Sequence, residues 1–231
     1  MDRICEAILK SQDIFLLLKL VSLSKLQETV GGGEALWGDS DSPHRLRNWI
    51  NDDGWRDWSD DDDEWRQQKS PRAVLLSELY SVRFLASETG ISKSEISNIL
   101  ARCYFSGLAK PSIESGRPIV NTRALSEFIA SGLRYVFPAT MGEMTRGIAT
   151  GLTAPIFGGE LRSATDHVPV WPDPKGNTSG LAVPPLFKTV PKAVRSDPDL
   201  YAMLALVDSV RIGLPRERNL AVSKLDERLR G

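Results

Sequence analysis

The sequence predicts a mainly α-helical fold of the α+β class, with a few short strands. Three observations support this prediction. Apolar residues recur at helical spacing near both ends of the chain, around 11–26 and 198–229. Residues 82–102 have the pattern of two short helices joined by a glycine turn. Residues 109–120 then have the pattern of a short β-hairpin.

The composition is that of a globular protein with a substantial core. The chain has 231 residues, of which 41% are hydrophobic and 26% charged. Its net charge of −1 shows no overall basic bias, so strong sequence-independent binding to nucleic acid is not expected. Cys5 and Cys103 are too few for a disulfide framework and indicate a reducing compartment. The apolar run 14–23 contains Lys19, lacks a cleavage site and is too short for a bilayer, so we expect a cytoplasmic protein without membrane contact.

The first predicted unit, residues 1–30, is a helix. Ser11 is its expected N-cap, and Asp13 lies in its first turn. The run IFLLLKLVSL is apolar almost all round, so the helix should be buried on more than one face. Two partners fit this helix: the domain at 71–133, or the same helix of a second copy in a homodimer.

Residues 31–70 form an acidic, tryptophan-rich segment that opens with three glycines and carries the acidic run Asp60–Glu64. One interpretation is an insertion or linker with a short helix around His44–Ile50. The other is an arm that docks a partner protein or covers a DNA-binding face. The run lacks the residue spacing of a calcium-binding loop. The tryptophans concerned are Trp37, Trp49, Trp55, Trp58 and Trp65.

Residues Val82–Arg102 have the features of a helix-turn-helix. Ala86 is a small residue where the helices cross, and Gly90 opens the turn. Ser92 and Glu95 have the spacing of a capping box at the start of the second helix. The inward positions are apolar: Leu85, Ile91, Ile96 and Ile99.

The segments around this motif complete a winged helix over 71–133. A first helix is expected at Ala73–Tyr80. After the motif, Ala109–Pro111 and Pro118–Val120 are short extended pieces around a turn at Glu114–Arg117, typical of a wing. Asn121 or Thr122 should then cap a helix that ends at Gly132.

These residues, LASETGISKSEISNILARCYFSGLAK with the strand RPIVN, resemble the winged helix-turn-helix of small bacterial regulators such as the MarR-like class. The resemblance covers Pro71–Leu133 and implies a DNA-binding domain, in a class that commonly dimerises through terminal helices. The chain departs from that class in its tryptophan-rich segment and in its C-terminal part. That last part, with YVFPATMGEMTRG, VWPDPKG and ALVDSVRIGLPRER, is similar to the tail of uncharacterised bacterial helix-turn-helix proteins, and no activity follows from it.

The C-terminal region, residues 134–231, is predicted to be loop-rich and then helical. Frequent glycine and proline in Tyr135–Gly180 argue against long regular elements there, although Val170–Pro172 should be extended. Pro191–Arg230 is predicted to be helical, with Asp197 as an N-cap, Pro198 in the first turn and a break at Gly213–Pro215. Dimerisation, partner binding or ligand sensing would fit this region.

The candidate DNA-contacting residues are the expected exposed positions of the second helix of the motif, together with one arginine at the wing. Their side chains suit base edges and phosphates. The helix from Ser92 would enter the major groove of double-stranded DNA, with Arg117 on the backbone. The residues are Ser92, Lys93, Ser94, Ser97, Asn98, Arg102 and Arg117.

The function we expect is that of a sequence-specific DNA-binding transcriptional regulator. The alternative is an antitoxin-like or other protein-interaction module that binds a partner enzyme and uses its winged helix for protein contacts or for autoregulation. Catalysis has little support, because His44 and His167 are far apart and no Cys/His set has zinc spacing. We therefore expect no enzyme activity, no metal and no cofactor.

Overall fold

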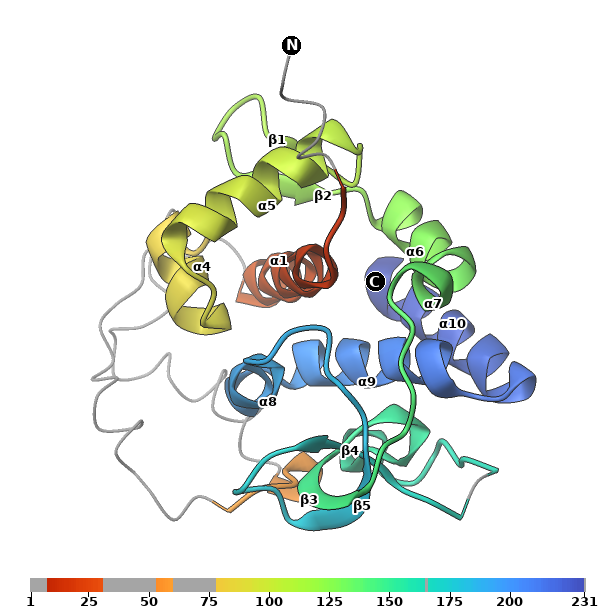
Figure 1. The fold of residues 1–231 in the computed structure, drawn as a ribbon. Coiled ribbons are helices and arrows are strands. Elements are labelled where there is room, and N and C mark those ends of the chain that lie inside the picture. Colours follow the sequence, from red (N-terminus) through yellow and green to blue (C-terminus); the bar gives the residue numbers. More distant parts are fainter. Residues whose placement is uncertain (1–7, 31–52, 60–77, 165, 231) are drawn as a thin grey trace.

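The computed structural model describes residues 8–30, 53–59, 78–164 and 166–230. The fold is mixed α+β and is arranged around one central helix, α1 (Ser11–Val30). In Figure 1, α5 (Lys93–Phe105) lies on one side of α1, and α9 (Pro198–Ile212) lies on the other. A small barrel of three strands covers the far side of α9.

Helix α1 is buried on several faces, as its apolar sequence predicts. Ile14–Leu18 are fully buried, and the helix contacts α5, α9 and the second strand of the hairpin. Its start differs from the prediction, because Ser11 is the first helical residue and its Oγ donates to the Leu186 carbonyl at 2.6 Å. Asp13 Oδ2 accepts the Lys10 N–H at 2.9 Å instead. The Ser11 hydroxyl, which was predicted to cap the helix, thus bonds to the Leu186 carbonyl.

The helix-turn-helix pattern corresponds to α4 (Val82–Thr89) and α5. Gly90 ends α4 with φ of 68°, a conformation that favours glycine. Ser92 Oγ accepts the Glu95 N–H at 3.3 Å, which is half of the predicted capping box. The Glu95 carboxylate turns toward α1, where charged donors compete with the single backbone N–H. The predicted inward residues are all buried: Leu85, Ile91, Ile96 and Ile99.

The predicted hairpin follows α5 directly. Strands β1 (Ala109–Pro111) and β2 (Pro118–Val120) pair antiparallel, with Lys110 opposite Ile119. Asn121 Oδ1 accepts the Ala124 N–H at 3.2 Å and caps α6 (Thr122–Ser131), which is followed by the short α7 (Leu133–Val136). Most of the predicted helix at Ala73–Tyr80 lies outside the described residues.

Part of the region predicted to be loop-rich is a closed three-stranded barrel: β3 (Met144–Ala149), β4 (Pro169–Pro172) and β5 (Thr178–Ala182). Strand β3 pairs antiparallel with both others, and β4 pairs parallel with β5. The glycines that suggested loops lie where strands approach closely. A Cβ at Gly147 would lie 2.1 Å from the Trp171 carbonyl oxygen, and one at Gly180 would lie 2.0 Å from that of Val168.

The C-terminal helices follow the prediction closely. Asp197 caps α9 by accepting the Leu200 N–H at 2.9 Å, and Pro198 opens the helix. After the break at Gly213, α10 (Pro215–Arg230) packs against α9 and α6. The remaining short helices are α8 (Val190–Ala193), η2 (Asp53–Trp55), η4 (Gly151–Thr153), η5 (Pro155–Phe157) and η6 (Val194–Ser196).

Two tryptophans of the predicted insertion belong to the core. Trp55 and Trp58 pack against Tyr201 of α9, with ring centroids 5.9 and 6.2 Å from the tyrosine ring. Trp171 of β4 lies 5.8 Å from the same ring. The short helix expected at 44–50 and the acidic run at 60–64 lie outside the described residues, as do Trp37, Trp49 and Trp65.

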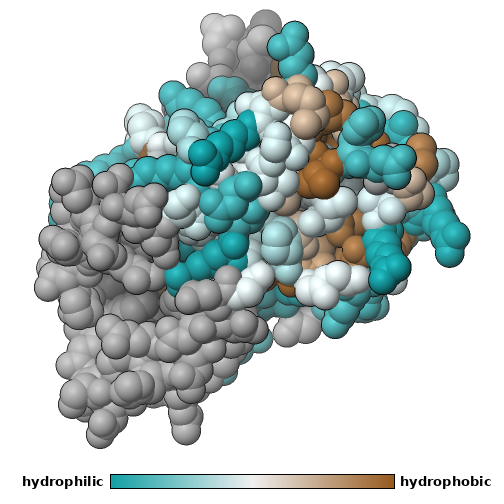
Figure 2. All heavy atoms as spheres, turned by 90° about the horizontal axis from the view of Figure 1, so that it is seen from below, coloured by the Kyte–Doolittle hydropathy of each residue, from teal (hydrophilic) through white to brown (hydrophobic). Residues whose placement is uncertain are grey.

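The surface on the barrel side is mixed in character. Figure 2 views the molecule from this side and shows apolar side chains gathered in one area with hydrophilic ones around them. Helix α5 is on the opposite side of the molecule (Figure 1). None of the helices in the described ranges is both long enough and apolar enough to cross a membrane.

Candidate nucleic-acid interface

Helix α5 exposes one polar face and buries the other. The polar positions recur at intervals of three and four residues, so they share one side of the helix. On the buried side, Ile96, Ile99 and Cys103 face the core. Five predicted contact residues lie together on the exposed side: Ser92, Lys93, Ser94, Ser97 and Asn98.

Arg102 lies elsewhere, contrary to the expectation that it is exposed. It is only 7% exposed, and its Nε and Nη2 donate to the two carboxylate oxygens of Asp13 at 2.9 and 2.7 Å. Asp13 is itself fully buried, and a buried carboxylate needs a cation and hydrogen bonds. The bonds to Asp13 raise the pKa of Arg102 above its ordinary value, although burial opposes this. Arg102 therefore anchors α5 to α1.

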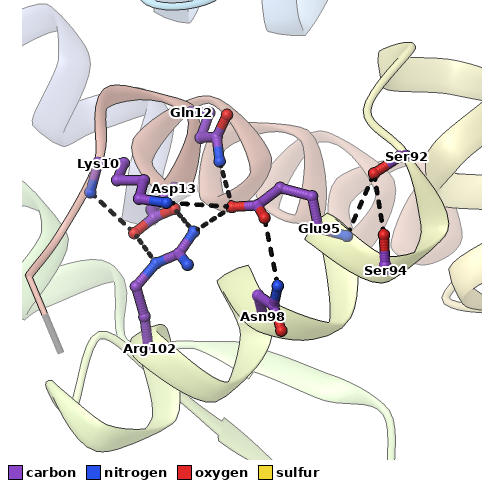
Figure 3. A network of polar contacts seen from close by, with 8 residues as sticks. All are labelled: Lys10, Gln12, Asp13, Ser92, Ser94, Glu95, Asn98 and Arg102. Atoms are coloured by element: carbon purple, nitrogen blue, oxygen red, sulfur yellow. Dashed lines mark hydrogen bonds and ion pairs between the residues drawn. The ribbon is translucent and has the colours of Figure 1, made fainter. Parts of the chain in front are cut away.

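Glu95 joins the exposed face to this anchor (Figure 3). Its Oε1 accepts from Arg102 Nη2 at 2.8 Å and from Gln12 Nε2, and Lys10 Nζ lies 3.8 Å away. Its Oε2 accepts from Asn98 Nδ2 at 3.3 Å. Partial burial acts to raise the pKa of Glu95, but the hydrogen bonds from Arg102 and Asn98 outweigh it, so this pKa lies below its usual range. Glu95 is therefore ionised at neutral pH.

The arginine predicted at the wing tip is packed against α1. Arg117 Nη1 donates to Gln27 Oε1 at 2.6 Å, and its guanidinium lies 5.6 Å from the centre of the Tyr80 ring. At the turn of the hairpin, Ile113 is fully exposed instead. Arg117, where the turn meets β2, thus links the hairpin to the end of α1.

Two exposed cations, on the elements that precede and follow α5 in the chain, were not among the predicted residues. Lys110 lies on the exposed side of β1, and Arg83 lies on the exposed side of α4. In β1, Ala109 is buried whereas Lys110 and Pro111 are exposed. Successive side chains of a strand point to opposite faces, so an inward Ala109 would have predicted an outward Lys110. Phe105, at the end of α5, is 75% exposed.

Three features within the described part of the chain were candidates for a reactive or binding site: metal-ligand clusters, the Cys103 thiol and a hollow beside α10. There, no three His, Cys, Asp or Glu side chains come together as a metal site. Burial raises the pKa of the Cys103 thiol to about 12, so this thiol is not a nucleophile. A hollow of about 280 Å³ beside α10 has charged lining residues that already pair, Lys224 with Glu227 and Arg228 with Asp199. The polar face of α5 is the strongest candidate site.

The comparisons with known proteins add no relative. No family model matches the chain, and no curated protein or solved structure matches it either. Any function must therefore be argued from the geometry of the chain itself.

Proposed function

We propose that this protein is a sequence-specific DNA-binding protein, a transcriptional regulator, whose α4, α5 and β1–β2 hairpin act as a winged helix. The observation that carries the proposal is the exposed polar face of α5, which holds five side chains able to hydrogen-bond. The major groove is wide enough to admit an α-helix. Helix α5 would enter it from the Ser92 end, with the hairpin beside the groove.

The residue types on this face suit both parts of a duplex. Lys93 suits phosphate or the acceptor atoms of guanine, and Asn98 suits adenine. Ser92, Ser94 and Ser97 can bond phosphate or sugar oxygens and fix the register of the helix. Ser92 also caps α5 at this end, and helix N-termini attract phosphate.

The buried contacts that fix α5 to the core also support the proposed function. A recognition helix must keep its side chains in fixed positions. This requires buried contacts that fix the helix to the rest of the protein. Arg102 and Asp13 provide such a contact between α5 and α1, and apolar residues of α5 pack into the same core. The exposed face is thus supported over the length of the helix.

The positive charge around this face is modest. This favours sequence-specific binding over sequence-independent electrostatic binding to DNA. Lys93 is exposed on this face, and Lys110, Arg83 and Lys10 are exposed on neighbouring segments, whereas Arg102 and Arg117 are hydrogen-bonded to residues of α1. Few cations mean few phosphate contacts and a shallow dependence of affinity on salt. One α5 spans few base pairs, so we expect two copies of the chain on a palindromic site.

The test is selection of bound duplexes from a randomised pool, followed by affinity measurement on the selected sequence. Lys93→Ala with Asn98→Ala should abolish preference for the selected sequence without lowering the thermal midpoint. The matched control changes an asparagine and a lysine on α10, Asn219→Ala with Lys224→Ala, and should bind like the unchanged protein. Unaltered binding by the first variant would overturn the proposal, as would a pool from which no sequence is enriched.

A second candidate function is a protein-interaction module, such as an antitoxin-like partner of an enzyme. One observation favours it: Phe105 at the end of α5 and Ile113 in the turn of the hairpin are exposed, at 75% and 103%. Exposed aromatic and aliphatic side chains are typical anchors of protein interfaces and gain nothing from phosphate. Phe105→Ser with Ile113→Ser should leave duplex binding intact under the first function. A protein partner that is lost with this variant, and kept by the Lys93/Asn98 variant, would favour the second.

A further inference from the structure

We infer that Glu95 is a positioning residue that turns the carboxamide of Asn98 so that α5 reads an adenine in the major groove. This inference rests on the proposed DNA-binding function and names the base that the same face recognises. It follows from the contact between Asn98 Nδ2 and Glu95 Oε2, at 3.3 Å, and from what holds Glu95 in place (Figure 3).

An ionised carboxylate can only accept hydrogen bonds. Asn98 must therefore point its nitrogen, and not its oxygen, toward Glu95. The two N–H bonds of a carboxamide lie on different sides, one beside the carbonyl oxygen and one away from it. The role we infer for Glu95 needs the second N–H on its carboxylate, and the edge that carries Oδ1 and the remaining N–H is then turned away from Glu95.

Adenine is the base that matches this edge. In the major groove it offers the N7 acceptor and the N6 amino donor, which pair with an amide N–H and an amide oxygen. Guanine offers two acceptors, N7 and O6, and would leave Oδ1 opposite another acceptor. A fixed amide thus prefers adenine, whereas an amide free to turn over would accept either purine.

Glu95 can hold Asn98 because other residues hold Glu95. Its second oxygen, Oε1, accepts from Arg102, which is itself bound to buried Asp13. Gln12 of α1 and Lys10, which precedes α1, approach the same oxygen. Rotation of the Glu95 carboxylate away from Asn98 would break these contacts. The exposed Asn98 amide is thus linked to buried Asp13 through Glu95 and Arg102.

The test is the base profile selected from a randomised duplex pool by the full chain and by single variants. The unchanged protein should select adenine at one position of each half-site. Asn98→Ala should lose that preference, on the order of tenfold in discrimination, and keep the other positions. Glu95→Ala should lose most of it at the same position only, although Asn98 is still present. Gln12→Ala is the matched control and should keep the adenine, because it removes a partner of Oε1 and leaves Oε2 on Asn98.

Glu95→Gln gives a directional outcome. Its single carbonyl oxygen should be taken by charged Arg102, which leaves an N–H₂ group facing Asn98. Asn98 would then turn over and present N–H donors, so the profile should move from adenine toward guanine. This variant keeps the side-chain volume, and circular dichroism melts check that each variant folds. If Glu95→Ala lowers the melting midpoint, the base profile of Glu95→Gln alone decides whether Glu95 positions Asn98.

The outcomes separate the two proposals. Retained adenine in both Glu95 variants, with its loss in Asn98→Ala, would overturn the positioning role and leave DNA binding intact. Retained adenine in Asn98→Ala would show that another residue reads the base. A pool from which the unchanged protein enriches no sequence would overturn both.

Discussion

Arg102 donates to both carboxylate oxygens of Asp13, at 2.9 and 2.7 Å, and so ties the second half of α5 to the first turn of α1. Asp13 is fully buried and Arg102 nearly so. The pair lies between α5 and α1 (Figure 3). An arginine predicted to contact DNA is thus used to fix the helix that would make the contact.

Breaking this pair from one side should be costly. Asp13→Ala leaves the Arg102 guanidinium buried with one carboxylate fewer, and we expect it to lower the free energy of unfolding by about 3–5 kcal/mol. Urea denaturation measures this change. Arg123→Ala is the control, because that exposed arginine pairs with Glu127 one turn away, and its effect should stay within about 0.5 kcal/mol. A loss below about 1 kcal/mol for Asp13→Ala would mean that the pair does not anchor α5.

Lys93 and Asn98 should contribute to DNA binding in different ways. Lys93→Ala removes a cation, so affinity should fall for all duplexes, and the slope of log affinity against log salt should shrink by about one. Asn98→Ala should weaken only the selected sequence and leave the slope unchanged. Fluorescence anisotropy over a salt series separates the two effects. Equal slopes for Lys93→Ala and the unchanged protein would argue against a phosphate contact at this position.

Trp58 should matter to stability as a core residue. It packs against Tyr201 and lies 5.2 Å from Trp55, measured between ring centroids. Trp58→Ala should lower the free energy of unfolding by about 3–5 kcal/mol, because it removes a large buried side chain. A thermal or urea melt followed at the backbone by circular dichroism gives the value. An unaffected midpoint would place Trp58 outside the core.

The barrel should reject any side chain at Gly147. A Cβ there would lie 2.1 Å from the Trp171 carbonyl oxygen, so β3 and β4 would have to separate. Gly147→Ala should cost about 3 kcal/mol or more, or prevent folding. Gly142→Ala is the control, since its Cβ would meet Ala182 at an ordinary 3.6 Å. Equal melting midpoints for the two variants would contradict the close approach of the strands.

Glu217 should make stability depend on acid pH. Burial acts to raise its pKa, but hydrogen bonds from Ser163, Leu214 N–H and Ala164 N–H outweigh it, so the folded pKa lies below the usual value. A lowered folded pKa means that the stabilisation is present at neutral pH and is lost as pH falls through that pKa. Glu217→Gln should therefore lower the free energy of unfolding at pH 7, by about 1 kcal/mol, and the difference should narrow below about pH 4.

The control for Glu217 is Glu227→Gln on the same helix. Glu227 is largely exposed and pairs with Lys224, so its replacement should change stability little at any pH. A difference for Glu217→Gln that stays constant from pH 7 to pH 3 would show that its carboxylate charge is not what stabilises the start of α10.

The sequence by itself determined the elements whose signals are local. Ser92, Asn121 and Asp197 each sit at a predicted helix start and each accept a backbone N–H three residues on. Gly90 has the positive φ that ends α4, and the hairpin pairs where extended pieces surround a turn. These signals act within a few residues, because capping and turns depend on the neighbouring backbone.

Only the tertiary structure decided which side chains form contacts within the protein. The sequence pattern predicts Arg102 as an exposed position of α5, which is wrong, because its burial depends on Asp13, 89 residues earlier in the chain. The barrel likewise depends on pairing between strands that are far apart in sequence, and the glycines that allow its close approaches look like loop residues until their neighbours are known. Trp55 and Trp58 join the core because Tyr201 lies opposite them. In each case the deciding partner is distant along the chain, so no local pattern contains it.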